Sequence, residues 1–261
     1  MTEKTPIFIG IDVACAKGKR LPICCVTKKG RRIEPIDLPD DVKGAIPRGP
    51  GNIEIQQPQP FRSLAAEVAG ALYKLAADGT YSIERIAIDA PAKGPTHSER
   101  HSERQLFDRR QSCFKTPIQK RWDEEIVPRC HKHLDEGGSL ARIPFANMIW
   151  MRYGFELFAA IRLKNFKVIE TYPNSIVKVI APNAERKTKA EGYRQQRDAI
   201  SDRTGSSAKG LEDALKRTVS GSKDDRLDAF MCAWVASLSC DELCAYGDKN
   251  NHDDCIWVPK R

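Results

Sequence analysis

The sequence PIFIGIDVA, residues 6–14, decides the fold of this chain. Isoleucine and phenylalanine dominate the run, one glycine interrupts it, and an acidic residue, Asp12, lies close to its end. A short apolar run of this kind predicts a buried strand, here over residues 7–13. A carboxylate beside such a strand loses hydration unless it is paired, hydrogen-bonded or bound to a metal ion. Asp12 is therefore the first candidate functional residue.

Strands and helices alternate downstream of this run, which is the pattern of an α/β protein. Apolar and β-branched stretches predict strands over residues 7–13, 21–27, about 31–37, 84–89 and 166–170. Apolar residues at helical spacing predict helices over residues 61–77, 140–163, 193–203, 208–219 and 223–243, with Ser139 as the N-cap of the second. Residues 93–136 break this rhythm because they are polar and rich in arginine and histidine. They predict a helical insertion after the fourth strand.

Size and composition limit the class of protein. The chain has 261 residues, of which 41% are apolar and 30% charged, as in a folded globular protein. This length fits a single domain, residues 1–261, that carries the inserted segment. No apolar run approaches the ~18 residues of a membrane span, and the N-terminus lacks the pattern of a signal peptide, so we expect a cytoplasmic protein with no membrane partner. The net charge of +8 is compatible with a polyanionic partner such as nucleic acid.

Acidic residues also stand at the ends of other predicted core elements. Asp89 ends the fourth strand, Glu170 ends the fifth, and Asp225 and Asp228 lie three residues apart on one side of the last helix. Such a cluster repels itself, and its natural counterion is a hard divalent cation, Mg²⁺ or Mn²⁺. Two such ions activate water and stabilise the leaving oxygen of a phosphodiester. The pattern predicts metal ligands at Asp12, Asp89, Asp225 and Asp228, with Glu170 as a further ligand.

Each carboxylate also has a simpler interpretation. An aspartate at a strand end is more often a turn former or a helix cap. Glu170 is able to pair with an arginine, and Asp224 and Asp225 are able to complement the dipole at the start of the last helix. The joint placement of the acidic residues favours the metal site, because the separate interpretations do not predict it.

The predicted insertion begins directly after Asp89, so it emerges at the same edge of the sheet as the carboxylates. Between residues 93 and 121 there are eight basic residues against three acidic ones. Arginine and lysine bind phosphate oxygens, and we expect substrate contacts from Lys93, Arg100, Arg104, Arg109, Arg110 and Lys115. Rings for stacking unpaired bases are offered by His97, His101, Phe114 and Trp122. A solvated helix with internal ion pairs is the alternative.

The C-terminal cysteines raise the question of a structural metal. The chain has nine cysteines, an odd number in a chain large enough to build its own core, so a disulfide framework is not expected. A single zinc ion is compatible with the loose spacing of Cys240, Cys244, His252 and Cys255. This spacing matches no common zinc finger. Unpaired thiols are therefore the preferred interpretation, and a zinc ion is the alternative.

The order of these motifs resembles a known family. The resemblance is carried by GIDVA, IAIDAPA, SERQLFDRRQSCFKTP, IETYPNS and DDRLDAFMCAWVA. Together they look like the domain-of-unknown-function family 429, whose members are predicted nucleases of the RNase H-like fold. The likeness runs from about residue 6 to residue 240. It implies an RNase H-like mixed five-stranded sheet flanked by helices, with the basic helical insertion as an addition.

The resemblance also implies roles for particular residues. Asp12 matches the aspartate of the first strand in the RNase H-like superfamily, and Asp89 matches the acidic residue of the fourth strand. The last helix is similar to the terminal helix of Holliday-junction resolvases, which favours Asp225 and Asp228 over Asp224. The inclusion of Glu170 rests only on the E-x-Y-P element of the narrower family.

The leading hypothesis is a divalent-metal-dependent nuclease that hydrolyses DNA or RNA phosphodiester bonds by a two-metal mechanism with Mg²⁺ or Mn²⁺. One alternative is a non-catalytic nucleic-acid-binding module on the same fold, which uses the basic insertion alone. A second alternative is an actin-like nucleotide-binding phosphotransferase. The sequence after GIDVA argues against it, because Gly18 is the one glycine offered there for a phosphate-binding loop.

Overall fold

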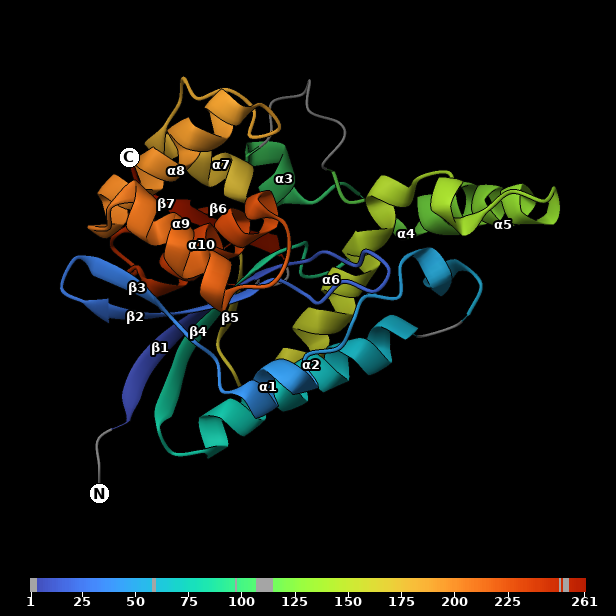
Figure 1. Ribbon diagram of the computed structural model, residues 1–261. Helices are drawn as coiled ribbons and strands as arrows, with labels where there is room; N and C mark the ends of the chain where they lie inside the picture. The colour runs from blue at the N-terminus through green and yellow to red at the C-terminus, as the bar shows by residue number, and fades with distance from the viewer. Residues whose placement is uncertain (1–3, 58–59, 97, 107–114, 249, 251–253) are drawn as a thin grey trace.

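The computed structural model describes residues 4–57, 60–96, 98–106, 115–248, 250 and 254–261. A mixed sheet forms its centre (Figure 1), with seven strands in the order β3-β2-β1-β4-β5-β7-β6. β1 pairs antiparallel with β2 and parallel with β4, β5 and β7 continue the parallel part, and β6 returns antiparallel. The strands are β1 (Thr5–Asp12), β2 (Ile23–Lys29), β3 (Arg32–Ile36), β4 (Tyr81–Asp89), β5 (Val168–Glu170), β6 (Leu243–Gly247) and β7 (Cys255–Pro259).

The α/β class and the mixed sheet are confirmed, but the expected count of five strands is wrong. The additional strands β6 and β7 form a C-terminal hairpin on the far side of β5. The helix expected to reach residue 243 ends at Ser237, because the backbone is extended at Leu238. The guanidinium of Arg85 donates to the carbonyl oxygens of Ala236 and Leu238 and so fixes this end. The residues after Ser237, which are no longer helical, are then available to form β6.

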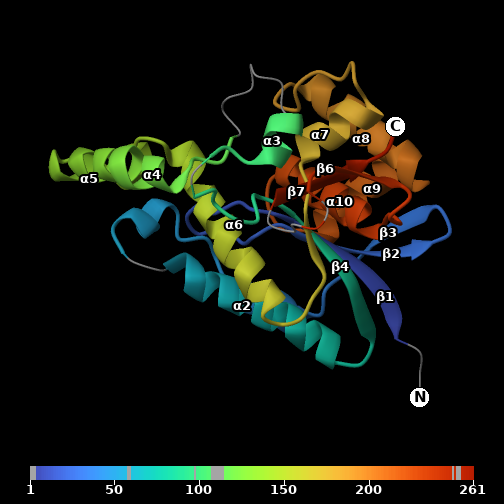
Figure 2. The same cartoon turned by 180° about the vertical axis from the view of Figure 1, so that it is seen from behind.

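Helices cover both faces of the sheet, as the two opposite views show (Figures 1 and 2). α7, α8, α9 and α10 lie on one face, and α2 and α6 lie on the other, each face with its own hydrophobic core. These helices are α2 (Pro60–Ala77), α6 (Ala146–Arg162), α7 (Pro173–Ile180), α8 (Ala190–Thr204), α9 (Ala208–Thr218) and α10 (Lys223–Ser237). The short elements before α2 are α1 (Asp40–Ala45) and the 3₁₀ turn η1 (Asn52–Ile55).

α10 lies directly against β1, and Gly10 permits this contact. A Cβ atom at Gly10 would come within 2.0 Å of the Ala229 carbonyl oxygen and 2.2 Å of the Ala233 nitrogen. Only glycine therefore allows the helix backbone to approach the strand this closely. The glycine that interrupts the first apolar run thus brings the first turn of α10 to the edge of the sheet where β1 ends.

α6 begins six residues later than expected. Ser139 precedes a short 3₁₀ turn, η4 (Leu140–Arg142), and gives no side-chain cap. Pro144 disfavours a helical conformation at the residue before it, and Ile143 is accordingly extended, with φ −63° and ψ 138°. The chain turns at Phe145, whose φ is 58°, and the helix follows. Because of this break, the first turn of α6 lies beside the ends of β1 and β4.

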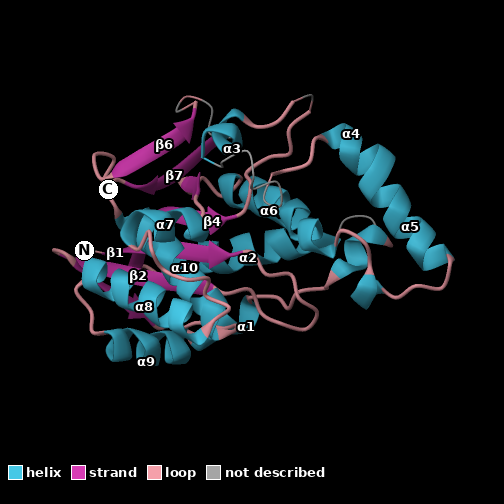
Figure 3. Ribbon diagram, turned by 90° about the horizontal axis from the view of Figure 1, so that it is seen from above, coloured by secondary structure: helices cyan, strands magenta, loops and turns pink. Residues whose placement is uncertain are grey.

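The expected insertion is helical in short pieces. They are α3 (His101–Leu106), α4 (Gln119–Arg121), the π-helical turn η3 (Trp122–Ile126) and α5 (Val127–Asp135). α4 and α5 extend away from the layers of the sheet, as the view from above shows (Figure 3). α3 instead lies against β6 and β7. The insertion therefore divides into an arm and a part that packs on the body of the protein.

Candidate functional site

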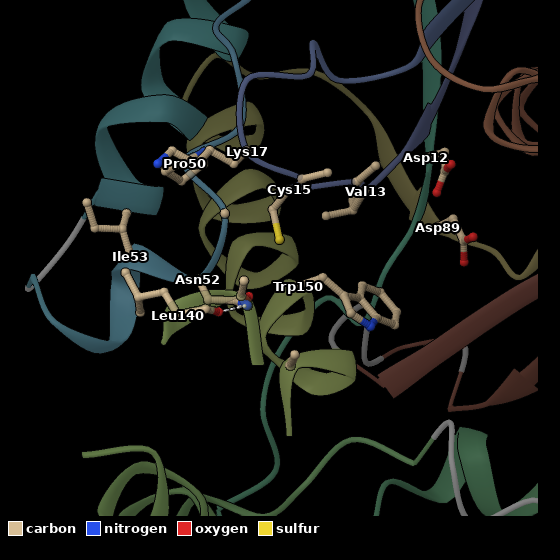
Figure 4. A pocket seen from close by; sticks show the side chains of 15 residues that line it. Asp12, Val13, Cys15, Lys17, Pro50, Asn52, Ile53, Asp89, Leu140 and Trp150 are labelled. Atoms are coloured by element: carbon tan, nitrogen blue, oxygen red, sulfur yellow. Dashed lines mark hydrogen bonds between the residues drawn. The ribbon is translucent and has the colours of Figure 1, made fainter. Parts of the chain in front are cut away.

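Two aspartates end neighbouring parallel strands. Asp12 is the last residue of β1, Asp89 is the last residue of β4, and the two are direct register partners. Their backbones are therefore about 4.8 Å apart. Side chains two or four residues apart on a strand point to the same face of the sheet. Phe8 lies four residues before Asp12, Ala87 lies two residues before Asp89, and both pack against the helical layer that contains α10. Both aspartate side chains therefore point to the α10 face. The structure thus brings together the two strand-end aspartates that the sequence singled out (Figure 4).

Burial and mutual repulsion raise the pKa of both carboxyl groups. The pKa of Asp12 is raised well above its usual value by burial first, then by the charges of Asp89 and Asp225, against the opposing effect of Lys187. Burial raises the pKa of Asp89 to about 7, with Lys187 lowering it and Glu170 raising it further. Strongly raised pKa values from burial and like charges are typical of functional sites. Both carboxyl groups therefore bind a proton more tightly than an exposed aspartate does.

The first turns of α10 bring more carboxylates to this edge. Asp225 forms a capping box with Ser222: the Ser222 N–H donates to Asp225 Oδ2 at 3.0 Å, and the Asp225 N–H donates to Ser222 Oγ at 3.2 Å. Asp228 is 6% exposed, and its Oδ2 accepts from Lys187. Within the described chain, the buried Oδ1 atoms of Asp224 and Asp228 accept no hydrogen bond. Asp225 therefore has a helix-capping role and still lies within electrostatic reach of the strand-end pair.

Lys187 is a residue of the site that the sequence did not indicate. It lies between α7 and α8, its ammonium group pairs with Asp228, and its charge acts on both Asp12 and Asp89. Residues 186–226 contain eleven basic and seven acidic residues, and their mixed charge does not single out one lysine. Only the fold brings this lysine to the carboxylates.

Carboxylate oxygens are the ligands that a hard divalent cation prefers. In the described ranges no group of three or more histidine, cysteine, aspartate or glutamate side chains is placed to hold a metal ion by itself. A catalytic Mg²⁺ commonly takes one or two protein carboxylates and completes its shell with water and substrate phosphates. Asp12 and Asp89 supply such a pair. The unsatisfied Oδ1 of Asp228 and the raised pKa values agree with a site that accepts additional positive charge.

Glu170 does not join this cluster. It is the register partner of Ile88, so its side chain points to the face opposite to that of Asp89. Arg100 donates to its two oxygens at 2.8 and 2.7 Å, and the Ala92 N–H donates to Oε2 at 2.7 Å. Glu170 is 1% exposed and Arg100 is 4% exposed. This geometry corrects two predictions: Glu170 is an arginine-paired carboxylate rather than a metal ligand, and Arg100 holds Glu170 rather than substrate.

Two further acids surround the same arginine. Arg100 lies 3.4 Å from Glu103 and 3.6 Å from Asp254. Glu103 accepts from the backbone N–H of Thr116 at 2.8 Å and from the Thr116 hydroxyl. Asp254 accepts from the Ser102 N–H at 3.0 Å, at the start of α3. This network ties the insertion and the C-terminal hairpin to β5.

The other predicted substrate contacts have mixed outcomes. Outside the described residues lie His97, Arg109, Arg110 and Phe114. Lys93 and Arg104 are exposed, whereas Lys115 pairs with Glu99 at 2.8 Å. Trp122 is 2% exposed, so its ring is not available for stacking on a base. Lys93 and Arg104 remain the accessible candidates for contacts with phosphate.

The C-terminal cysteines lie on different faces. Cys244 of β6 is the register partner of Val258. Cys255 lies three residues before Val258 on β7, so its side chain points to the opposite face. Cys240 is exposed after the end of α10, and His252 lies outside the described residues. This arrangement does not fit one zinc ion shared by Cys244 and Cys255.

A cleft of about 700 Å³ opens beside the two aspartates (Figure 4). Its walls are the segment after β1, residues 50–53, the turn η4 and the first turns of α6. Lys17, Asn52 and Trp150 line it together with Asp12 and Asp89. Trp150 lies within the helix predicted over residues 140–163, whose apolar spacing indicates packing and no other role for it. Its place in the cleft depends on where α6 begins, which the periodicity did not fix.

Comparisons with known proteins give one match. A family model described as Protein of unknown function (DUF429) matches residues 10–251. The searches of curated proteins and of solved structures returned no match. No helix in the described part of the chain is long and apolar enough to cross a membrane.

Proposed function

This chain belongs to the DUF429 family, and we propose that it is a divalent-metal-dependent nuclease that hydrolyses phosphodiester bonds of nucleic acid. The observation that carries the proposal is the register pairing of Asp12 with Asp89, next to the first turn of α10. Ligand sites in α/β sheets commonly lie at the carboxyl ends of the strands. Both aspartates stand at such ends.

The topology supports an RNase H-like assignment. The order β3-β2-β1-β4-β5, with β2 antiparallel to both of its neighbours, is the strand order of that fold. The hairpin of β6 and β7 then extends the sheet beyond the five strands. Because a fold alone does not determine an activity, the proposal rests on the carboxylates and takes the topology as additional support.

In this proposal Asp12 and Asp89 hold the cation, and Asp225 and Asp228 add negative charge from α10. A divalent ion bound there lowers the pKa of a water molecule and stabilises the charge on the leaving oxygen. The chain contributes placement: strand register fixes the first two carboxylates, the capping box fixes Asp225, and Lys187 holds Asp228. A nuclease site of this kind also needs basic groups nearby, and Lys17 lines the cleft beside the two aspartates.

The proposal is tested by cleavage of end-labelled single-stranded, double-stranded, branched and hybrid oligonucleotides with Mg²⁺ or Mn²⁺. We expect cleavage by the wild-type protein that EDTA abolishes. Asp12→Asn and Asp89→Asn each remove one charged metal ligand, and we expect each to lower the rate by at least about 100-fold, the scale on which one transition-state contact acts. Asp213→Asn is the matched control, because it makes the same chemical change at an exposed position of α9.

Two results would overturn the proposal. The first is no metal-dependent cleavage of any substrate in the panel by wild-type protein. The second is equal cleavage by wild type and Asp12→Asn, which would trace the activity to a contaminant. Salt-dependent binding that EDTA and Asp225→Ala leave unchanged would instead support the non-catalytic binding module.

A further inference from the structure

Backbone hydrogen bonds hold the walls of the cleft beside Asp12 and Asp89 in place. The segment after β1 lies against residues 48–51 through backbone hydrogen bonds. The Gly18 N–H donates to the Gly49 carbonyl at 2.9 Å, and the Gly51 N–H donates to the Cys15 carbonyl at 2.8 Å. Such pairing fixes the shape of the cleft before any ligand arrives. Ligand sites are usually preformed in this way.

The chemistry of the cleft changes along its length (Figure 4). Two carboxylates stand at one end, Ile53 and Leu140 stand at the other, and the indole of Trp150 lies between them. The indole N–H donates to the Asn147 carbonyl oxygen at 2.7 Å, which fixes the orientation of the ring. Trp150 is only partly buried, so part of the ring is accessible to a ligand in the cleft.

Polar groups complete the lining. The side-chain N–H of Asn52 donates to the Leu140 carbonyl at 3.1 Å, and no described residue is shown donating to its amide oxygen, which is able to accept a hydrogen bond from a ligand. Lys17 is exposed and forms no ion pair with any described residue. A flat apolar face, one acceptor and one cation match a ligand with an aromatic ring, an amino group and a phosphate. A nucleotide has all three.

Building on the proposed nuclease function, we infer that this cleft binds one unpaired nucleobase of the substrate strand, stacked on Trp150. In a duplex the faces of the bases are covered by their neighbours, so only an unpaired base has a face to offer an aromatic side chain. The volume of about 700 Å³ is within the usual range of small-ligand sites. The strand is therefore single where its phosphodiester reaches the carboxylates.

The test measures binding without cleavage. Fluorescence anisotropy in EDTA gives the Kd of a labelled single-stranded 15-mer, of the blunt duplex of the same sequence and of a mononucleotide. We expect the single strand to bind at least about tenfold more tightly than the duplex. Loss of one stacking contact weakens binding by about 5- to 150-fold, so we expect this loss in Trp150→Ala and Trp150→Leu and near-normal binding in Trp150→Phe. Tyr73→Ala, an exposed aromatic residue of α2, is the control and should bind as wild type does.

Each outcome is decisive for the inference. Equal binding of duplex and single strand overturns it, and so does wild-type binding by Trp150→Leu in a protein whose thermal unfolding is normal. Tight binding of the mononucleotide alone also overturns it and favours a nucleotide-using enzyme. The proposed function fails separately: single-strand binding that depends on Trp150, without cleavage by wild type in Mg²⁺ or Mn²⁺, keeps the cleft and removes the nuclease. Cleavage that depends on Asp12 but not on Trp150 supports the nuclease and overturns the binding of a base in the cleft.

Discussion

Two groups of buried or half-buried carboxylates lie at the same edge of the sheet, on opposite faces, and they differ in how their charge is balanced. The arginine cluster consists of Arg100 with Glu103, Glu170 and Asp254. The aspartate cluster consists of Lys187 with Asp12, Asp89, Asp225 and Asp228. One guanidinium faces three carboxylates in the first cluster, and one ammonium group faces four in the second.

Hydrogen bonding separates the two clusters more sharply than charge counting does. In the arginine cluster, Glu170 receives both ends of a guanidinium fork and a backbone N–H, and Glu103 receives two bonds from Thr116. In the aspartate cluster, a buried oxygen of Asp228 has no donor among the described residues. Burial raises the pKa of carboxyl groups in both clusters, so the difference lies in the hydrogen bonds that the carboxylates accept. Buried carboxylate oxygens that accept hydrogen bonds stabilise one structure, whereas a buried carboxylate oxygen without a donor is typical of a site that takes a ligand.

The largest effect is expected from breaking the arginine cluster. Arg100→Met leaves three buried or half-buried carboxylates without their cation, and removal of one partner of a buried ion pair costs about 3–5 kcal/mol. Glu170→Gln keeps the shape and leaves Arg100 with two carboxylates, so we expect a smaller loss. Urea denaturation at pH 7.5 measures both. Arg121→Met, in an exposed pair with Glu125, is the control and should cost at most about 1 kcal/mol.

The same variants distinguish the two interpretations of Glu170. If its carboxylate is structural, Glu170→Gln lowers the unfolding free energy but leaves Mn²⁺ affinity within about twofold of wild type. A loss of Mn²⁺ binding with unchanged stability would return Glu170 to the metal site. That result would also remove the distinction between the two clusters.

The second effect is a pH dependence of stability that comes from the aspartate cluster. The pKa of Asp89 is about 7 in the folded protein and near 3.9 in an unfolded chain. Between these values the folded state binds the proton more tightly, so stability is lost as the pH rises through this window. Asp89→Asn removes that loss. Between pH 5 and pH 8 in EDTA, we expect the unfolding free energy of the wild type to fall by about 2–3 kcal/mol more than that of Asp89→Asn.

Asp213→Asn serves as the control for this prediction, because Asp213 is exposed on α9. Its stability should follow the wild-type pH dependence. An identical pH dependence for wild type and Asp89→Asn would mean that the pKa of Asp89 is not raised in the folded protein, because nearby positive charge already balances its carboxylate. The aspartate cluster would then be as well balanced as the arginine cluster.

Local patterns predicted the core of the fold but not its edges. The strands that end at Asp12 and Asp89 were predictable because each is an apolar run with its own boundary. β6 and β7 were missed because their cysteines were interpreted as possible zinc ligands and because the last helix has no sequence signal at its true end. The late start of α6 had a visible signal in Pro144, which the strong apolar periodicity around it outweighed.

The site was predictable only as far as its residues belong to regular elements. The face to which Glu170 points was not predictable, because a strand of three residues covered on both sides shows no alternation of polar and apolar positions. Lys187 and Trp150 reach the site through a loop and through the break before α6. Their roles depend on contacts between segments far apart in the chain, and single-residue patterns do not contain that information.

The smallest expected effect concerns the one cation of the aspartate cluster. Lys187 occupies the negative potential that a divalent ion would occupy, so it competes with the metal. We expect Lys187→Gln to bind Mn²⁺ about 3- to 10-fold more tightly than wild type by calorimetric titration, a modest factor because Lys187 is partly solvent-exposed and its charge is screened. Without metal, the same variant should be less stable, because its carboxylates then lose the ammonium group that faces them in the described part of the chain.

Lys189→Gln is the matched control, two residues further on, where the lysine pairs with Glu185 at 3.0 Å on the surface. Its Mn²⁺ affinity should equal that of wild type. Weaker Mn²⁺ binding by Lys187→Gln would mean that Lys187 orients Asp228 for the metal instead of competing with it. The aspartate cluster would then resemble the arginine cluster, with its cation as a fixed part of the structure. Tighter Mn²⁺ binding by Lys187→Gln would mean that a metal ion is able to replace the charge of Lys187, whereas Arg100 is a fixed part of the arginine cluster.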